Sequence, residues 1–157
     1  MQNPLDPNGR LSAFGTQLIE IHDGLREELA RLQDDVDDYL DDPTGPRPGP
    51  LHTVQAHCLA FCSALERHHT QEDDTTFDVL LDDNPGLRPV IEQLRRDHHI
   101  VSGMLRSIEA LVGRIGPDLD AAGGRRVRAE VEGLAALMES HFTYEERKLV
   151  VALDALS

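Results

Sequence analysis

Histidine and glutamate residues recur along this chain at spacings typical of one face of an α-helix. Two segments carry a histidine with a glutamate four residues later, and two other segments carry a histidine among apolar residues. Residues four positions apart lie one turn apart on the same side of a helix. Imidazole nitrogen binds zinc, copper, iron and nickel, and a cation neutralises carboxylates that would be costly to bury alone. The pattern indicates a metal site with six candidate ligands: His22, His68, Glu72, His98, His141 and Glu145.

Clusters of proline, glycine and aspartate divide the chain into four long segments. The clusters are Asp41–Pro50, which is predicted to contain no helix, Asp82–Gly86 and Gly116–Gly124. Within each segment apolar residues recur every three or four positions, which predicts amphipathic helices rather than strands. The expected helices lie near residues 11–40, 51–81, 87–115 and 120–154, after an N-terminal arm at 1–10.

The short connections favour an all-α fold, an up-down-up-down antiparallel four-helix bundle that forms a single domain over residues 1–157. At about 100° per residue, each of the four histidines falls on the apolar stripe of its helix. Counted from the loops, their heights differ by two residues or fewer, which is about 3 Å of helical rise. The histidines are therefore predicted to share one layer, with the two glutamates in the adjacent layer.

Buried carboxylates are the strongest reason to expect metal ions in this layer. A single core histidine is usually a structural residue satisfied by hydrogen bonds. Two glutamates in an apolar core repel each other unless a cation lies between them. Four nitrogen donors and two carboxylates suit two metal ions, and six ligand residues leave open coordination positions for solvent or a small ligand.

The motif residues resemble the hemerythrin-like family, also called the HHE cation-binding domain. Its recurring phrase is His-Phe-x-x-Glu-Glu, and the chain reads HFTYEE at 141–146 and HHTQED at 68–73. The segments IHDGLREEL and LRRDHHIV are similar to the helices of that family that carry a single histidine, and the resemblance covers nearly all of the chain after residue 10. It implies two non-haem iron ions with Glu72 and Glu145 as bridges, and dioxygen, hydrogen peroxide or nitric oxide as the ligand.

One departure from the family pattern bears on function. Oxygen-carrying hemerythrins have a second histidine one turn along the third helix, where this chain has Ser102 or Gly103. One iron is therefore predicted to lack a histidine and to have an extra open position. This favours turnover of peroxide or nitric oxide by a peroxidase-like or catalase-like oxidoreductase, although whether the chain is an enzyme stays open. A non-catalytic oxygen-binding or iron- and oxygen-sensing module is the alternative, and a zinc ion that only stabilises the core is a third.

Residues beside the candidate ligands have less certain roles in the sequence. His69 and His99 each follow a ligand and should point about 100° away from it. They are expected to lie at the flank, with exchange of either one for its neighbour left open. Asp73 and Glu146 either hydrogen-bond the ligands from outside or face solvent.

Several other polar residues are expected to be structural. His57 lies three turns from His68, about 16 Å away, and is expected to be a satisfied core histidine. Tyr144 is expected to pack near the seam of the bundle, with a hydrogen bond to a bound ligand as the minority alternative. Cys58 and Cys62 are expected to be reduced buried thiols.

Composition narrows the range of partners. The chain has 15 basic against 29 acidic residues, a net charge of −14, which disfavours nucleic-acid binding. There is no apolar stretch of about 20 residues to cross a membrane and no signal-peptide pattern at the start. A small-molecule ligand, a cytoplasmic location and a monomer or weak dimer are therefore expected.

Overall fold

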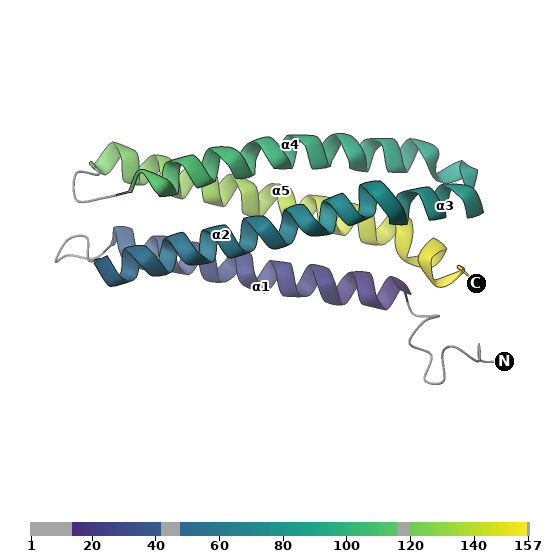
Figure 1. The fold of residues 1–157 in the computed structure, drawn as a ribbon, viewed down its shortest axis with the longest axis horizontal. Helices are drawn as coiled ribbons and strands as arrows, with labels where there is room; N and C mark the ends of the chain where they lie inside the picture. The colour runs from purple at the N-terminus through teal and green to yellow at the C-terminus, as the bar shows by residue number, and fades with distance from the viewer. Residues whose placement is uncertain (1–13, 42–47, 116–119, 157) are drawn as a thin grey trace.

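The computed structural model is a bundle of long helices (Figure 1) and describes residues 14–41, 48–115 and 120–156. Within these ranges the chain contains helices and no strand, so the predicted all-α fold is confirmed. The elements are α1 (Phe14–Leu40), α2 (Pro48–Gln71), the π-helix η1 (Glu72–Thr76), α3 (Phe77–Asp83), the 3₁₀-helix η2 (Pro85–Leu87), α4 (Arg88–Gly113) and α5 (Ala121–Asp154).

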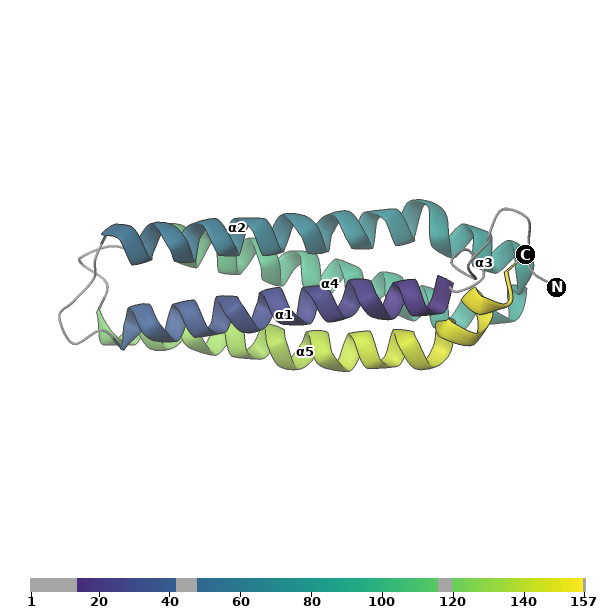
Figure 2. The ribbon, with the colours of Figure 1, turned by 90° about the horizontal axis from the view of Figure 1, so that it is seen from below.

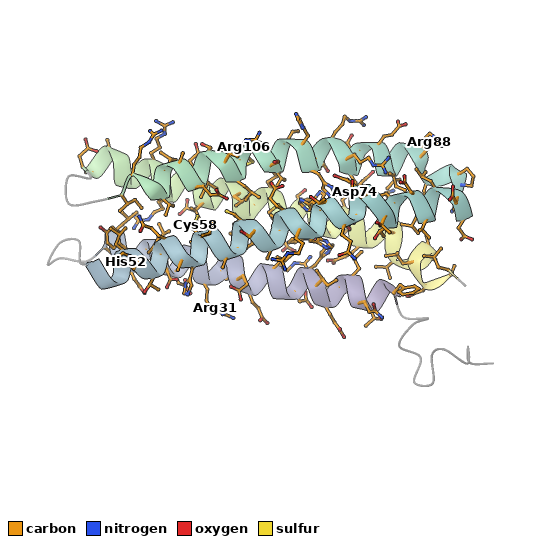
Figure 3. All side chains as sticks on the ribbon, viewed as in Figure 1. Arg31, His52, Cys58, Asp74, Arg88 and Arg106 are labelled. Atoms are coloured by element: carbon orange, nitrogen blue, oxygen red, sulfur yellow. The ribbon has the colours of Figure 1, made fainter. Side chains whose placement is uncertain are left out.

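The long helices pack around a common interior. α1 contacts α2 and α5, and α4 also contacts α2 and α5. Figures 1 and 2 show the start of α1, the end of α5 and the short α3 at one end of the bundle. Charged side chains such as Arg31, Arg88 and Arg106 point outward (Figure 3). None of the described helices has the length and hydropathy needed to cross a membrane.

The helix boundaries differ from the predicted ones at two loops. α2 begins at Pro48, so the expectation that no part of Asp41–Pro50 is helical was wrong for its last three residues. Proline is tolerated in a first helical turn, where its missing N–H has no partner to lose. α5 begins at Ala121, where the Asp120 side chain accepts a hydrogen bond from the backbone N–H of Gly123 at 2.7 Å. The arm predicted at residues 1–10 lies outside the described residues.

A wide turn interrupts the second predicted helix, which was expected to run unbroken from 51 to 81. Glu72–Thr76 forms a π-helical turn between α2 and α3. Such turns are rare in helices and occur often at functional sites, because the extra residue changes which side chains face inward. The backbone carbonyl of Asp73 within this turn accepts a hydrogen bond from Arg95 on α4 at 3.0 Å.

The apolar core is divided into two clusters along the bundle. The larger cluster fills the end near the α1–α2 connection and includes Leu25, Leu65, Val101 and Met138. The smaller cluster fills the other end and consists of Leu18, Phe77, Leu80, Ile91, Leu94, Leu149 and Leu153. On α1, α4 and α5, and along the continuous run of α2, η1 and α3, a candidate ligand lies in sequence between a residue of one cluster and a residue of the other. The candidate ligands therefore form a polar layer with an apolar cluster on each side.

Candidate metal centre

The polar layer contains two compact groups of potential metal-binding side chains. One group consists of His22, His68, Glu72 and Glu145, and the other of His69, His98 and His141. Within each group, one ligand atom from every residue lies within 4.8 Å of all the others. Six of the seven residues are at most 4% exposed, and His68 is slightly more open, with its side chain 10% exposed. All six sequence-predicted candidates belong to one of these two groups.

Two carboxylates connect the two groups. One oxygen of Glu145, Oε1, lies 3.6 Å from Nε2 of His22, and the other, Oε2, lies 3.4 Å from Nε2 of His141. Glu145 therefore faces an imidazole of each group.

Glu72, in η1, has a similar position. Its Oε1 atom lies 3.5 Å from Nε2 of His68 and 3.3 Å from Nε2 of His98. Both glutamates thus lie where a carboxylate could bind two ions at once.

His69 is the residue that sequence reasoning misplaced. It was expected to point away from the centre, but it is 4% exposed and belongs to the group of three imidazoles. Its ring stacks on that of His98, with centroids 3.8 Å apart. Consecutive residues on a helix point about 100° apart, and here the two directions reach two different groups, because the polar layer is wide enough to receive both side chains. His69 on α2 thus places a third imidazole beside His98 and His141, where the sequence analysis expected none.

The third helix does not provide that imidazole. Ser102 accepts a hydrogen bond from exposed Arg106 at 3.0 Å. The signal for His69 was present in the sequence as the pair His68–His69, but a helical wheel assigns only one of two adjacent residues to a narrow apolar stripe.

Carboxylates outside the centre orient three of the imidazoles. Nδ1 of His22 lies 2.7 Å from Glu146, Nδ1 of His98 lies 2.9 Å from Asp73, and Nδ1 of His141 lies 3.3 Å from Asp97. A carboxylate at Nδ1 holds the proton there and leaves the Nε2 lone pair for a metal ion. In all three histidines Nε2 is the atom directed at Glu72 or Glu145.

Two of these outer carboxylates were among the alternatives raised by the sequence, and one was missed. Asp73 and Glu146 contact ligands rather than facing solvent alone. Glu146 is itself held by Arg26, at 3.0 Å. Asp97 gave no motif signal, because its partner His141 lies 44 residues away on another helix.

Most inward-facing polar atoms of the centre lack a hydrogen-bond partner. Nε2 of His69, His98 and His141, and both carboxylate oxygens of Glu72 and Glu145, are buried without a hydrogen bond among the described residues. Unpaired buried polar atoms are rare and costly. Seven such acceptor-type atoms converging in one layer fit a pair of cations, because each lone pair would then have a positive partner.

Burial and neighbouring charges shift the pKa values of several groups in the centre. Burial lowers the pKa of His68 to about 4 and that of His98 to about 3. Burial, reinforced by the nearby Glu145 carboxylate, holds the pKa of Glu72 well above its usual range. Burial alone would also raise the pKa of Glu145, but its interactions with Glu72, His141 and His22 outweigh that effect and hold it well below its usual range. Burial alone would lower the pKa of His141, but its contacts with Glu145 and Asp97 outweigh that effect and raise it. Without a cation, the site therefore favours neutral His68 and His98 and one protonated glutamate.

The remaining polar residues lie outside the centre. His99 is exposed, so it does not replace His98 in the centre. His57 pairs with Asp35 at the surface of the α1–α2 interface and is 41% exposed, so the expectation of a core position was wrong. Cys58 and Cys62 are buried and free, as expected.

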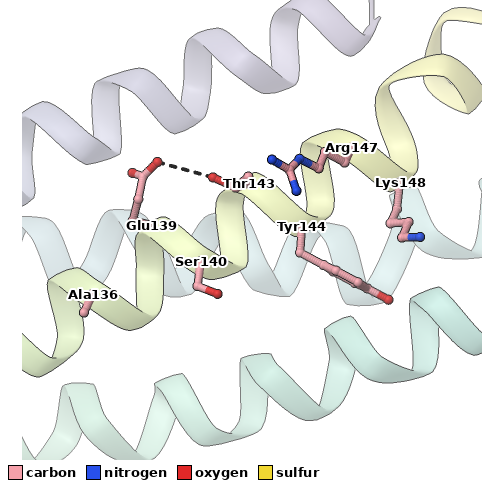
Figure 4. A pocket seen from close by; sticks show the side chains of 7 residues that line it. All are labelled: Ala136, Glu139, Ser140, Thr143, Tyr144, Arg147 and Lys148. Carbon is pink, nitrogen blue, oxygen red and sulfur yellow. Dashed lines mark hydrogen bonds between the residues drawn. The ribbon is translucent and has the colours of Figure 1, made fainter.

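Tyr144 packs against the smaller apolar cluster. It lines a surface hollow along α5 with Ser140 and Lys148 (Figure 4), and the Lys148 ammonium lies 5.8 Å from the centre of its ring. This agrees with the expected packing role.

Comparison with known proteins identifies the family. No curated protein and no solved structure matched the chain. A family described as the hemerythrin HHE cation binding domain matches residues 15–153, which includes every residue of both groups. The chain therefore belongs to the hemerythrin HHE cation-binding domain family.

Proposed function

We propose that this chain holds two non-haem iron ions and uses them to bind and turn over a small oxygen or nitrogen ligand, such as hydrogen peroxide, nitric oxide or dioxygen. The proposal takes the helices to be arranged up-down-up-down, so that α2 and α5 supply the paired histidine and glutamate motifs from opposite sides. The observation that carries it is the pair of ligand groups joined by Glu72 and Glu145, whose buried oxygens lack partners. Iron would supply Lewis-acid and redox chemistry at this position.

The two groups differ in their number of imidazoles, and this supports ligand binding at one of them. His69, His98 and His141 provide three nitrogen donors, whereas His22 and His68 provide two. If both glutamates bind both ions, the group that contains His22 and His68 leaves more coordination positions open. The prediction of an open coordination position is thus still supported, but by the unequal number of imidazoles and not by the histidine missing from the third helix.

Buried aromatic side chains pack against two imidazoles of the centre. Phe142 stacks on the ring of His22 with centroids 4.2 Å apart, and Phe77 stacks on His98 at 5.7 Å. Both phenylalanines are fully buried. Exclusion of water strengthens the interactions of the carboxylates with bound cations and limits side reactions.

Metal content, followed by peroxide decay, tests the proposal. Freshly purified protein should contain two iron ions per chain and should remove hydrogen peroxide faster than the same amount of free iron. His68→Gln and Glu145→Gln should abolish the excess rate, whereas His52→Gln, at an exposed position of α2, should retain it. Turnover equal to that of free iron, or unchanged in the two ligand variants, would refute the enzymatic proposal. Zinc in place of iron would favour a structural site.

A non-catalytic oxygen-binding or sensing module is the second candidate, and His69 is the observation that favours it. With His69 the centre contains five imidazoles, the number that the resemblance to oxygen-carrying hemerythrins implies. Reversible oxygen spectra that survive many cycles would support this function. Rapid autoxidation without a stable adduct would count against it.

A further inference from the structure

A cavity of about 340 Å³ opens beside the centre, at the end of the bundle where α1, α2, η1, α3 and the end of α5 meet. Its lining consists of six apolar side chains, four neutral polar side chains and two members of the candidate centre. These residues are Phe14, Gln17, Leu18, Ile21, His68, Gln71, Glu72, Thr75, Thr76, Val79, Leu153 and Leu156.

The cavity reaches one of the two ligand groups and not the other. Among its lining residues, His68 and Glu72 belong to the group with two imidazoles, and no lining residue belongs to the group with three. His68 is also the most exposed of the seven residues. The cavity therefore connects solvent with the group that has more open coordination positions.

The chemistry of the lining selects for an uncharged, partly apolar molecule. Among the described residues no lysine or arginine lines the cavity, and the one carboxylate in this part of its lining is Glu72 of the centre. An anion would enter a chain of net charge −14 without a cationic partner in the wall. Leucine, isoleucine, valine and phenylalanine side chains instead provide a surface for a short hydrocarbon chain.

We propose that this cavity binds a small alkyl hydroperoxide, with its hydrocarbon chain against the apolar wall and its oxygen end beside His68 and Glu72. Ligand pockets commonly enclose about 300–1,000 Å³, so a cavity at the lower limit suits a chain of roughly five carbons and excludes large lipids. The inference rests on the proposed function, because it names the substrate class of the same centre. It concerns binding only.

A non-reacting probe tests binding independently of turnover. The probe 6,6,6-trifluoro-1-hexanol has a short apolar chain with a terminal oxygen and no O–O bond, and ligand-observed ¹⁹F NMR reports its binding to the protein as purified. Saturable binding is expected. Ile21→Trp and Val79→Phe, at partly exposed lining positions, should each weaken it about tenfold or more by filling the cavity.

Ile100→Trp is the matched control, because Ile100 has similar exposure on α4 and does not line the cavity. It should leave probe binding unchanged, and all three variants should be compared at equal helicity by circular dichroism. The KM for pentyl hydroperoxide should also rise in Ile21→Trp, with the KM for hydrogen peroxide unchanged.

Four outcomes separate this inference from the proposed function. Absence of saturable probe binding, or equal binding in the filled variants, would overturn the inference even if hydrogen peroxide is turned over. Binding that requires deletion of residues 1–10 would also overturn it, because the chain itself would then be the occupant. Probe binding that is lost in the filled variants supports the cavity as a binding site. The same binding without any peroxide turnover would refute the proposed function alone.

Discussion

His22 on α1 and His68 on α2 direct their Nε2 atoms at each other across 3.3 Å. Nδ1 of His22 is already engaged by Glu146, so its Nε2 is the nitrogen left to accept. In the metal-free protein the Nε2–H of His68 can donate a hydrogen bond to it. A cation between the two rings and Glu145 would instead take both lone pairs. The sequence predicted that these two histidines share one layer, and the structure shows that their Nε2 atoms face each other between two helices.

His69 should contribute to metal retention, although it follows the motif histidine of its helix. His69→Ala removes one of three imidazoles from its group, so this variant should lose about one metal equivalent per chain. Elemental analysis of the purified protein measures the loss. His99→Ala is the control, since His99 is exposed beside His98. Full metal occupancy in His69→Ala would assign its ring to packing alone.

The outer carboxylates should tune metal affinity without touching the metal. Asp73→Asn and Asp97→Asn weaken the hold on the Nδ1 atoms of His98 and His141, and each should lower metal affinity about 10- to 100-fold. Competition with a coloured chelator measures the change. Asp74→Asn, an exposed position next to Asp73 (Figure 3), should leave affinity unaltered. Equal affinity in all three variants would contradict the role of these carboxylates.

The metal-free protein should become less stable as pH falls from about 6.5 to about 4.5. Burial lowers the pKa values of His68 (to about 4), His98 (to about 3) and His69. In this pH range these histidines therefore bind protons in the unfolded chain but not in the folded chain. Each such histidine costs about 1.4 kcal/mol of stability per pH unit. Glu72, whose pKa is raised, and Asp73, whose pKa is raised to about 6, act in the opposite direction below their folded pKa values. Three histidines against two carboxylates leave a net slope of about one histidine in the middle of this range, and His141, whose pKa is raised, opposes it only near the upper end.

Urea unfolding at several pH values after chelation measures this slope. Glu72→Gln should make it steeper, because the substitution removes one of the two opposing groups. His52→Gln, outside the centre, should not change it. Stability that rises as pH falls over this range would contradict the assignment of neutral buried histidines.

Removal of the metal should destabilise the protein, and Glu72→Gln should reduce that loss. A cation that binds only the folded state adds stability by mass action. In the metal-free protein, ionising Glu72 at neutral pH is costly because its pKa lies well above the usual range. A neutral glutamine should therefore raise the melting temperature of the chelated protein while lowering that of the metal-loaded one. A lower melting temperature in both forms would show that Glu72 serves packing rather than metal binding.

Gly15 should be essential for close packing between α1 and α5. A Cβ atom there would lie 2.6 Å from Cγ1 of Val150 and 2.8 Å from its backbone oxygen, and the Gly15 N–H donates to Asp154 at 2.8 Å. Gly15→Ala should cost about 1–3 kcal/mol of unfolding free energy. Gly24→Ala is a matched control with open space around the new methyl group, and should stabilise by up to about 1 kcal/mol. Denaturant unfolding distinguishes the two, and equal effects would contradict the steric argument.

Local information in the sequence was sufficient for the helices and for most of the site. Apolar periodicity predicted the all-α fold, and the spacing of His68–Glu72 and His141–Glu145 placed each pair on one face, because both patterns depend only on residues within a few turns. The same local reasoning could not foresee the π-helical turn at Glu72–Thr76, where backbone groups bond to Arg95 on another helix. It also could not show that His68 and His69 both point into the bundle.

The sequence by itself determined which chemistry is present: imidazoles and carboxylates at one depth of a helical bundle. The tertiary structure alone decided how they divide into two groups, that His69 joins His98 and His141, and that Asp97 supports His141 from another helix. Helical periodicity is set by the backbone of one helix, so it can be read along the chain. The division of ligands depends on the rotation and separation of neighbouring helices, which are set by packing between residues far apart in sequence.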